Sequence, residues 1–192
     1  LSDKVENIPN KYFSKCCKLT EINIPSGCKI IGDDAFNGCK LLTTIDTDNS
    51  NVKTYGARVF ANTSIKELKF NKNVTSLGNA LFLNTPIEKI SFDLELKEFN
   101  CDSLSIENTI TEVEFNETSF TEKAFTNKTN LKSISVNKYL GKEIPNNCFS
   151  NCTSLSNISI PRTYNIIKTN AFANCSSLTK IFIRYILYFI TQ

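Results

Sequence analysis

The chain has 192 residues, of which 41% are apolar, and 22 Lys and Arg against 19 Asp and Glu give a formal net charge of +3. The apolar fraction predicts a folded core and excludes a disordered chain, while the small positive excess does not by itself indicate a nucleic-acid or membrane-surface partner. Because the sequence has no histidine, Ser-His-Asp and Cys-His catalytic systems and His-containing metal sites are excluded. It begins at Leu1 rather than Met, so we expect a fragment or a processed form.

In chain order, one short frame, Leu-x-x-Ile-x-Ile, recurs about every 23 residues. Its last two apolar residues lie on one face of a strand. One unit cannot bury that face alone, so we expect the units to stack as coils with parallel strands around a continuous apolar interior. The middle apolar positions of the eight units are Ile22, Ile45, Leu68, Ile90, Val113, Ile134, Ile158 and Ile181.

A second frame precedes most of these strands and reads apolar-x-x-x-x-Phe, often followed by Asn or Gly and then by Cys or Thr. We expect its phenylalanines to fill the interior from the opposite wall. The fifth unit has Leu104 or Ile106 in that place and is degenerate. Gly32, Gly56 and Gly78 each precede a repeat Phe by four residues, which indicates a turn that tolerates glycine best. The repeat phenylalanines are Phe13, Phe36, Phe60, Phe82, Phe125, Phe149 and Phe172.

The stretches IPSGCKIIGDDAFNGCKLLTTI (24–45), KEIPNNCFSNCTSLSNISIP (142–161) and IIKTNAFANCSSLTKIFI (166–183) resemble the BspA-like class of leucine-rich repeats. The resemblance implies an α/β, right-handed solenoid of about eight repeats of roughly 23 residues, forming a single domain over 1–192. Parallel strands would line the concave face, with short helical, 3₁₀ or extended segments opposite. Members are typically surface or secreted proteins of bacteria and protists, and several are associated with adhesion. Units three to five depart from the motif, so we expect irregular curvature there.

The C-terminal apolar run, 181–190, is broken by Arg184 and is short for a membrane span. A buried strand is the favoured interpretation, and the start of a truncated membrane anchor is the alternative. Residues 184–192 would then form a C-terminal cap on the last coil or a truncated continuation of the repeats.

The eight cysteines show neither zinc spacing nor a clear disulfide pattern. Cys16, Cys39, Cys152 and Cys175 each follow a repeat Phe by three residues, so we expect them to form one column of free, buried thiols, with bridging between adjacent coils as the alternative. Seven N-x-S/T motifs give weak support for an extracellular protein, because the repeat itself is rich in Asn, Ser and Thr. They begin at Asn62, Asn73, Asn116, Asn127, Asn151, Asn157 and Asn174.

The residues that flank each middle apolar position should point outward on the concave face, where a protein partner would bind. The alternative is an ordinary solvated surface whose charges neutralise one another. The predicted partner-binding residues are Glu21, Asn23, Thr44, Asp46, Glu67, Lys69, Lys89, Ser91, Glu112, Glu114, Ser133, Ser135, Asn157, Ser159 and Lys180.

The sequence has no phosphate-binding Gly-rich loop and no G-x-S-x-G motif, and its adjacent acidic pair Asp33-Asp34 fits a turn better than acid-base catalysis. We therefore expect a non-enzymatic protein-interaction module with no cofactor, metal, nucleic-acid partner or small-molecule substrate. The expected partner is a host or matrix protein, and the expected location is the cell surface or the exterior. Membrane contact would come only through an anchor outside this fragment. The alternatives are an intracellular scaffold or regulatory subunit and, least favoured, a carbohydrate-processing enzyme or its binding domain.

Overall fold

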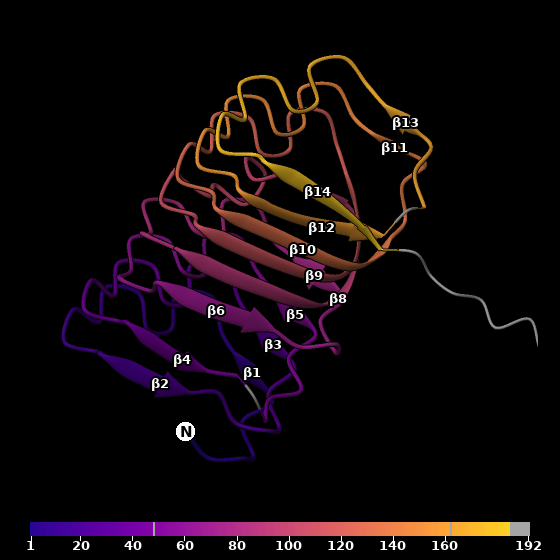
Figure 1. The fold of residues 1–192 in the computed structure, drawn as a ribbon. Helices are drawn as coiled ribbons and strands as arrows, with labels where there is room; N and C mark the ends of the chain where they lie inside the picture. The colour runs from indigo at the N-terminus through magenta and orange to yellow at the C-terminus, as the bar shows by residue number, and fades with distance from the viewer. Residues whose placement is uncertain (48, 162, 185–192) are drawn as a thin grey trace, which may run out of the picture.

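The computed structural model describes residues 1–47, 49–161 and 163–184, the last five by their backbone alone. The described chain folds as a stack of coils in which every strand pairing is parallel (Figure 1). Its strands are β1 (Asn7–Ile8), β2 (Glu21–Asn23), β3 (Ile30–Ile31), β4 (Thr44–Asp46), β5 (Thr54–Tyr55), β6 (Glu67–Phe70), β7 (Ser76–Leu77), β8 (Lys89–Phe99), β9 (Glu112–Phe120), β10 (Ser133–Tyr139), β11 (Glu143–Ile144), β12 (Asn157–Pro161), β13 (Ile166–Ile167) and β14 (Lys180–Arg184).

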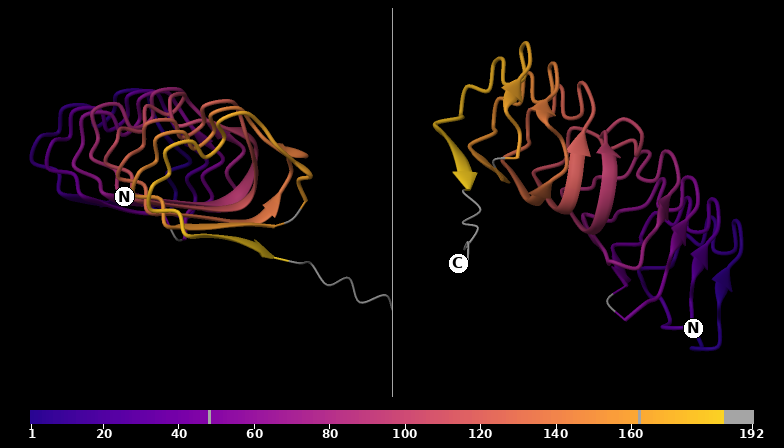
Figure 2. Two further views of the ribbon diagram at one scale, coloured as in Figure 1. Left: turned by 45° about the horizontal axis from the view of Figure 1, so that its top comes forward. Right: turned by 90° about the vertical axis from the view of Figure 1, so that its right-hand side faces the viewer.

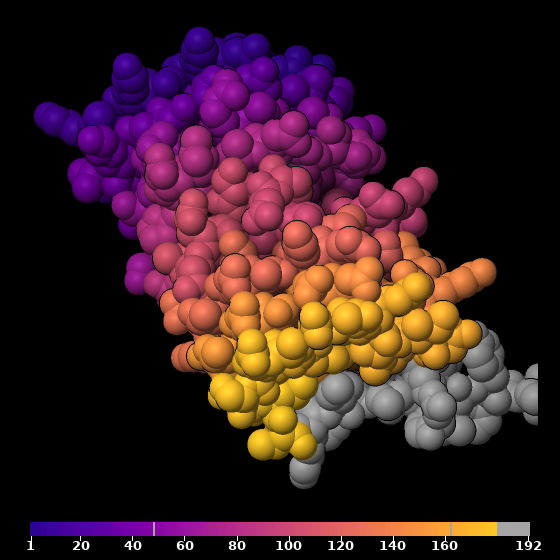
Figure 3. Space-filling view, turned by 90° about the horizontal axis from the view of Figure 1, so that it is seen from above, coloured from indigo at the N-terminus to yellow at the C-terminus, as the bar shows by residue number. Residues whose placement is uncertain are grey.

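The longer strands line one side of the stack and the two-residue strands line another (Figure 1). The long side holds the pair β2-β4 and the six-stranded sheet β6-β8-β9-β10-β12-β14. The short side holds β1-β3-β5-β7 and the pair β11-β13. Successive coils follow one another without interruption along the face in Figure 3.

The predicted strand register is confirmed. Each of the eight middle apolar positions lies in a strand of the long side, and paired strands align these positions with one another: Ile22 with Ile45, Leu68 with Ile90, Ile90 with Val113, Val113 with Ile134, Ile134 with Ile158, and Ile158 with Ile181. The eight strands therefore bound about seven turns of a parallel solenoid.

The repeat phenylalanines stack along the axis inside the coils, as predicted. Ring centroids of neighbouring coils lie 5.1–6.3 Å apart for Phe13–Phe36, Phe36–Phe60, Phe60–Phe82, Phe125–Phe149 and Phe149–Phe172. In the degenerate fifth coil Leu104 and Ile106 are both buried, and Phe99 instead stacks on Phe125 at 5.1 Å. An aromatic ring from the end of β8 thus continues the stack that the repeat motif leaves incomplete.

The segments around each repeat Phe are turns, and none of the described residues is helical, so the α/β class and the helical or 3₁₀ segments are not confirmed. The reason lies in the backbone. Alternate amides donate to carbonyls of the next coil instead of to their own segment: Arg58 N to Asn79 O, Phe60 N to Leu81 O and Asn62 N to Leu83 O. The residues two before and two after the repeat Phe also have positive φ, which an α-helix cannot contain.

Asparagine is common two residues after the repeat Phe because that position is left-handed. Asn62, Asn84, Asn127, Asn151 and Asn174 have φ of 54–62° there, and Gly38 has φ 81°. The side chains also pair between coils: Asn151 Nδ2 donates to Asn127 Oδ1 at 2.8 Å, and Asn174 Nδ2 donates to Asn151 Oδ1 at 2.7 Å. This ladder accounts for the Asn of the repeat motif.

The cysteine column is a hydrogen-bonded feature of the same turn. The thiols of Cys39, Cys152 and Cys175 donate to the carbonyls of Phe13, Phe125 and Phe149 in the preceding coils at 3.0–3.1 Å. Thr85 makes the equivalent bond to the Phe60 carbonyl at 2.5 Å, so a Thr hydroxyl takes the place of the Cys thiol in this coil.

All eight cysteines are free. The prediction of a wholly buried column is wrong at Cys16, which is exposed, and Cys175 is only partly buried. Cys16 lies in the first coil and has no described coil on its outer side. Burial raises the pKa of the Cys152 thiol to about 12, which keeps this thiol protonated and unreactive at neutral pH.

Gly32, Gly56 and Gly78 are required for a reason other than the one the sequence suggests. Gly38 is the glycine with a positive φ among the described residues, so the three do not adopt the turn conformation that favours glycine. Instead the coils approach too closely for a side chain: a Cβ on Gly56 would lie 2.5 Å from Asp33 N, and one on Gly78 would lie 2.3 Å from Gly56 C. The glycine column therefore sets how closely the coils can stack.

The irregularity expected in the middle units takes the form of long, bent strands. β8 has 11 residues and β9 has 9, and both continue from the long side around the edge of the coil (Figure 2). Their pairing shifts register between Phe92 and Glu95 and again between Leu96 and Phe99. These bulges let Leu94 and Phe99 stay buried while the strand turns the corner.

Two predictions concern the C-terminus. The backbone of 181–184 belongs to β14, whereas the proposed cap or continuation over 184–192 lies, beyond Arg184, outside the described residues. The described part of the chain contains no helix with the length and apolarity that a bilayer crossing demands.

We predict that Gly56→Ala destabilises the protein by about 1–3 kcal/mol, because the new methyl group meets rigid backbone of the preceding coil. Urea unfolding followed by circular dichroism would measure the change. Ser76→Ala, at an exposed position of β7, is the control and should shift stability by no more than about 0.5 kcal/mol. Equal effects would contradict the close-approach explanation.

Phe60→Ala should cost about 3–5 kcal/mol, because Phe60 is fully buried between Phe36 and Phe82. The same unfolding measurement on Tyr12→Ala, whose side chain is 64% exposed, provides an aromatic control with a small expected effect. A loss below about 1 kcal/mol at Phe60 would be inconsistent with the stacked interior.

Candidate functional site: the polar sheet face

The polar sheet face is the outward side of the long strands and is formed by the predicted flanking residues. Among them Glu21, Asn23, Thr44, Asp46, Glu67, Lys69, Lys89, Glu114 and Asn157 are exposed, and Ser91, Glu112, Ser133, Ser135 and Ser159 are partly exposed. Lys180 pairs with Asn157 through the backbone, and its side chain lies outside the described set. Ile45, Leu68 and Ile90, which lie between outward residues of β4, β6 and β8, are buried. Inward and outward side chains therefore alternate along these strands, as the sequence predicts.

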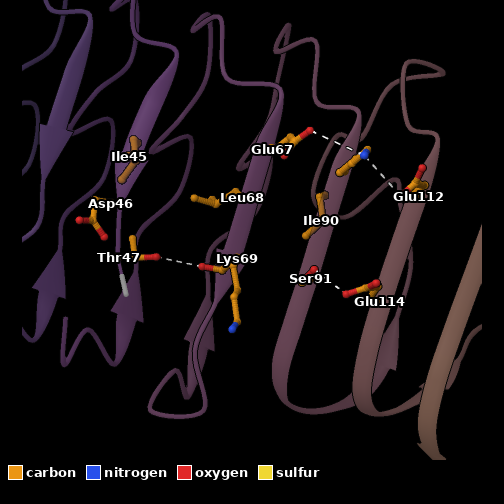
Figure 4. A pocket seen from close by; sticks show the side chains of 11 residues that line it. Ile45, Asp46, Thr47, Glu67, Leu68, Lys69, Ile90, Ser91, Glu112 and Glu114 are labelled. Carbon is orange, nitrogen blue, oxygen red and sulfur yellow. Dashed lines mark hydrogen bonds and ion pairs between the residues drawn. The ribbon is translucent and has the colours of Figure 1, made fainter. Parts of the chain in front are cut away.

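Charged side chains on this face form a short chain across three strands (Figure 4). Lys89 Nζ lies 3.9 Å from a carboxylate oxygen of Glu67 on β6 and 3.6 Å from one of Glu112 on β9. One lysine thus serves two carboxylates. Beside it, the Ser91 hydroxyl donates to Glu114 Oε2 at 3.0 Å. The Glu67–Lys89 ion pair therefore extends to Glu112, and Lys89 links three strands.

The face is hollowed over several strands. A shallow depression of about 500 Å³ is lined by outward residues of β4, β6, β8 and β9, by the buried Ile45, Leu68 and Ile90 between those residues, and by Thr47. A second, of about 330 Å³, shares Lys69, Ser91 and Glu114 with the first and extends to Ser135 and Asn137. A third continues to Ser159 on β12. The depressions follow the face that the sequence predicts to be concave.

Further ion pairs lie beside these rows. Lys66 Nζ lies 2.8 Å from Glu88 Oε1, and Lys138 Nζ lies 2.8 Å from Glu117 Oε2. The hydrogen bond to the carboxylate raises the pKa of both lysines, so each stays charged at neutral pH. These pairs connect neighbouring coils, as cross-strand pairs do in other sheets.

The sequence prediction missed a third row of outward residues. Asp93, Asn116 and Asn137 line the second depression, next to the predicted rows on β8, β9 and β10. The alternating pattern in Phe92-Asp93-Leu94 could have revealed the first of these, because it shows that the strand runs on past the repeat frame.

The geometry suits contact over a broad area. The depressions are shallow. Polar side chains line most of them, together with Ile45, Leu68 and Ile90 in the first and Phe92 and Phe115 in the second. Within residues 1–47, 49–161 and 163–184, no three His, Cys, Asp or Glu side chains gather in a way that could hold a metal ion. The face offers carboxylates, ammonium groups, hydroxyls and amides that a large partner could meet at several points at once.

The sequence matches the model of the BspA type leucine-rich repeat region, with six copies over residues 1–111 and 103–192. The chain belongs to the BspA-type leucine-rich-repeat family. The resemblance inferred from the repeat motif is therefore confirmed. A comparison with functionally curated proteins gives no match.

The chain is also similar to solved bacterial leucine-rich-repeat structures. A T. pallidum leucine-rich-repeat protein shares 19% identity over 91% of this chain and 72% of its own, with a TM-score of 0.47. One from Eubacterium ventriosum shares 17% over 93% and 70%, with a TM-score of 0.41. A leucine-rich cell surface protein of Faecalibacterium prausnitzii shares 19% over 92% and 62%, with a TM-score of 0.42.

Because Lys69 points outward and Leu68 points inward, we predict opposite results from adjacent substitutions. Lys69→Ala should change the unfolding free energy by no more than about 0.5 kcal/mol, whereas Leu68→Ala should cost about 2–5 kcal/mol. Denaturant titration of the two variants measures both. A large loss at Lys69 would show that the strand faces are assigned the wrong way round.

Proposed function

We propose that the chain is a non-enzymatic protein-interaction module that binds its partner through the polar sheet face, as part of a cell-surface or secreted protein with a role in adhesion or host interaction. The family supports an interaction role, since repeat solenoids provide extended surfaces for other proteins. The proposal covers the predicted single domain over 1–192.

The observation that carries this proposal is the run of hollowed, polar surface across β4 to β12. Outward residues of six successive strands line three depressions that share residues with one another. An open surface of this kind suits a macromolecule, whereas small-molecule sites are concave and mostly apolar. The same openness disfavours a carbohydrate-processing enzyme, which would need a deep cleft between its two carboxylates.

The proposed surface location rests on what the family implies more than on the N-x-S/T motifs. Four of the seven motifs begin at the left-handed position after the repeat Phe, so repeat geometry already accounts for Asn62, Asn127, Asn151 and Asn174. Only the motifs at Asn73, Asn116 and Asn157 lie outside that position.

A second candidate is an intracellular scaffold or regulatory subunit that uses the same face. The state of the cysteines favours it: all eight are free, and three of the four column thiols are engaged with backbone carbonyls. Free thiols are typical of reducing compartments. Localising the protein in its native cells would decide between the two candidates.

Binding of the purified chain to a panel of purified extracellular-matrix proteins, followed by surface plasmon resonance, tests the main proposal. We expect saturable binding to at least one of them and its loss in Ser135→Arg, which places a bulky side chain in the second depression. Asn170→Arg is the matched control, because Arg58 occupies the equivalent left-handed position two residues before a repeat Phe. Binding that Ser135→Arg leaves unchanged would overturn the assignment of the face.

A further inference from the structure

We propose that the polar sheet face takes a cationic, extended polypeptide segment, an inference that rests on the function proposed above and specifies its partner. The two largest depressions on this face are lined by five carboxylates and two lysines, a formal charge of −3. The whole chain carries +3, so the rest of the molecule carries +6. The face therefore has the opposite sign to the protein that bears it.

The lysines do not cancel this negative charge. Lys89 is shared between Glu67 and Glu112, so this trio keeps a net charge of −1. Glu114 receives a hydroxyl hydrogen bond from Ser91, which satisfies an oxygen without neutralising the carboxylate. Asp93 is exposed beside this bond, on the same strand as Ser91. A cationic partner would supply the charge that the face lacks.

The shape of the face indicates an extended segment. Alternate residues on a strand are about 6.8 Å apart, and neighbouring strands are about 4.8 Å apart. Glu112 and Glu114 are alternate outward residues of β9, so an extended segment lying along β9 could place alternate Lys or Arg side chains against both. The depression is too open to enclose a small amine. Anionic polymers would be repelled by the carboxylates of this face.

The acidic part of the polar sheet face ends at β9. β10 and β12 continue it with Ser133, Ser135, Asn157 and Ser159, which are neutral. A bound segment would thus have its basic part over β4–β9, and any continuation over β10 and β12 would be polar and uncharged. Because the carboxylates are exposed to solvent, salt screens them, and the affinity of the face for a cationic segment should fall steeply as ionic strength rises.

Fluorescence anisotropy with two labelled nine-residue peptides tests the inference: one alternates Lys with Ser, and the other alternates Glu with Ser. We expect the lysine peptide to bind, its affinity to fall roughly tenfold from low to physiological ionic strength, and the glutamate peptide not to bind. The double variant Glu112→Gln/Glu114→Gln should weaken lysine-peptide binding roughly tenfold or more.

Asp102→Asn/Glu107→Gln is the matched control, since it removes two exposed carboxylates of the fifth-coil turn and changes the net charge equally. Thermal melts should show that both double variants remain folded. Equal binding of the glutamate peptide, or equal weakening by the control, would overturn the cationic-partner inference. Suppose that a matrix protein binds the chain, that Ser135→Arg abolishes this binding, and that the lysine peptide does not displace the matrix protein. This result would overturn the cationic-partner inference and leave the proposed function in place.

Discussion

Hydrogen bonds between the backbones of successive coils are the constraint on which the rest of the structure depends. They join the strands on both sides of the stack, and they also continue through the turns, where amides around the repeat phenylalanines from Phe13 to Phe149 donate to the next coil. Because these inter-coil hydrogen bonds occupy the backbone amides and carbonyls of each coil, a helix is not required to pair them. The resulting stack brings equivalent residues of all coils into columns, and each column must suit its fixed surroundings.

The columns explain the composition of the repeat. Phenylalanine fills the interior, Asn or Gly accepts the left-handed turn, and Cys or Thr donates to the carbonyl of the previous coil. Glycine stands where the backbones approach most closely. The Cys and Asn positions of the repeat resemble motifs for redox chemistry and glycosylation, but the geometry of coil stacking accounts for most of them. The pair Asp34 and Arg58 belongs to the same system: hydrogen bonds from the guanidinium lower the pKa of the Asp34 carboxyl and link two coils.

The strands and their faces could be predicted from sequence because burial repeats with a period of two within a frame that repeats about every 23 residues. Ile22, Leu68 and Ile158 all take their predicted places. The conformation of the turns could not be predicted in the same way. Their amides donate to carbonyls of another coil, and local secondary-structure propensity does not reveal such long-range acceptors. For the same reason the sequence predicts a turn conformation at Gly56, whereas the close approach of Asp33 is what requires glycine there. The extension of β8 around the edge brings Phe99 against Phe125 and Asp93 into the second depression. It accompanies the missing Phe of the fifth coil, where the repeat frame gives no signal for it.

The polar sheet face follows from the same stacking, because residues that cannot enter the interior are aligned in rows on its outside. Native-state amide hydrogen exchange tests the stacking most directly. The account predicts that the amides of Phe36, Phe60, Phe125 and Phe149, although they lie in turns, exchange as slowly as those of Ile90 and Val113 within the sheet. Exchange at the rate of exposed loops at these four positions would contradict it.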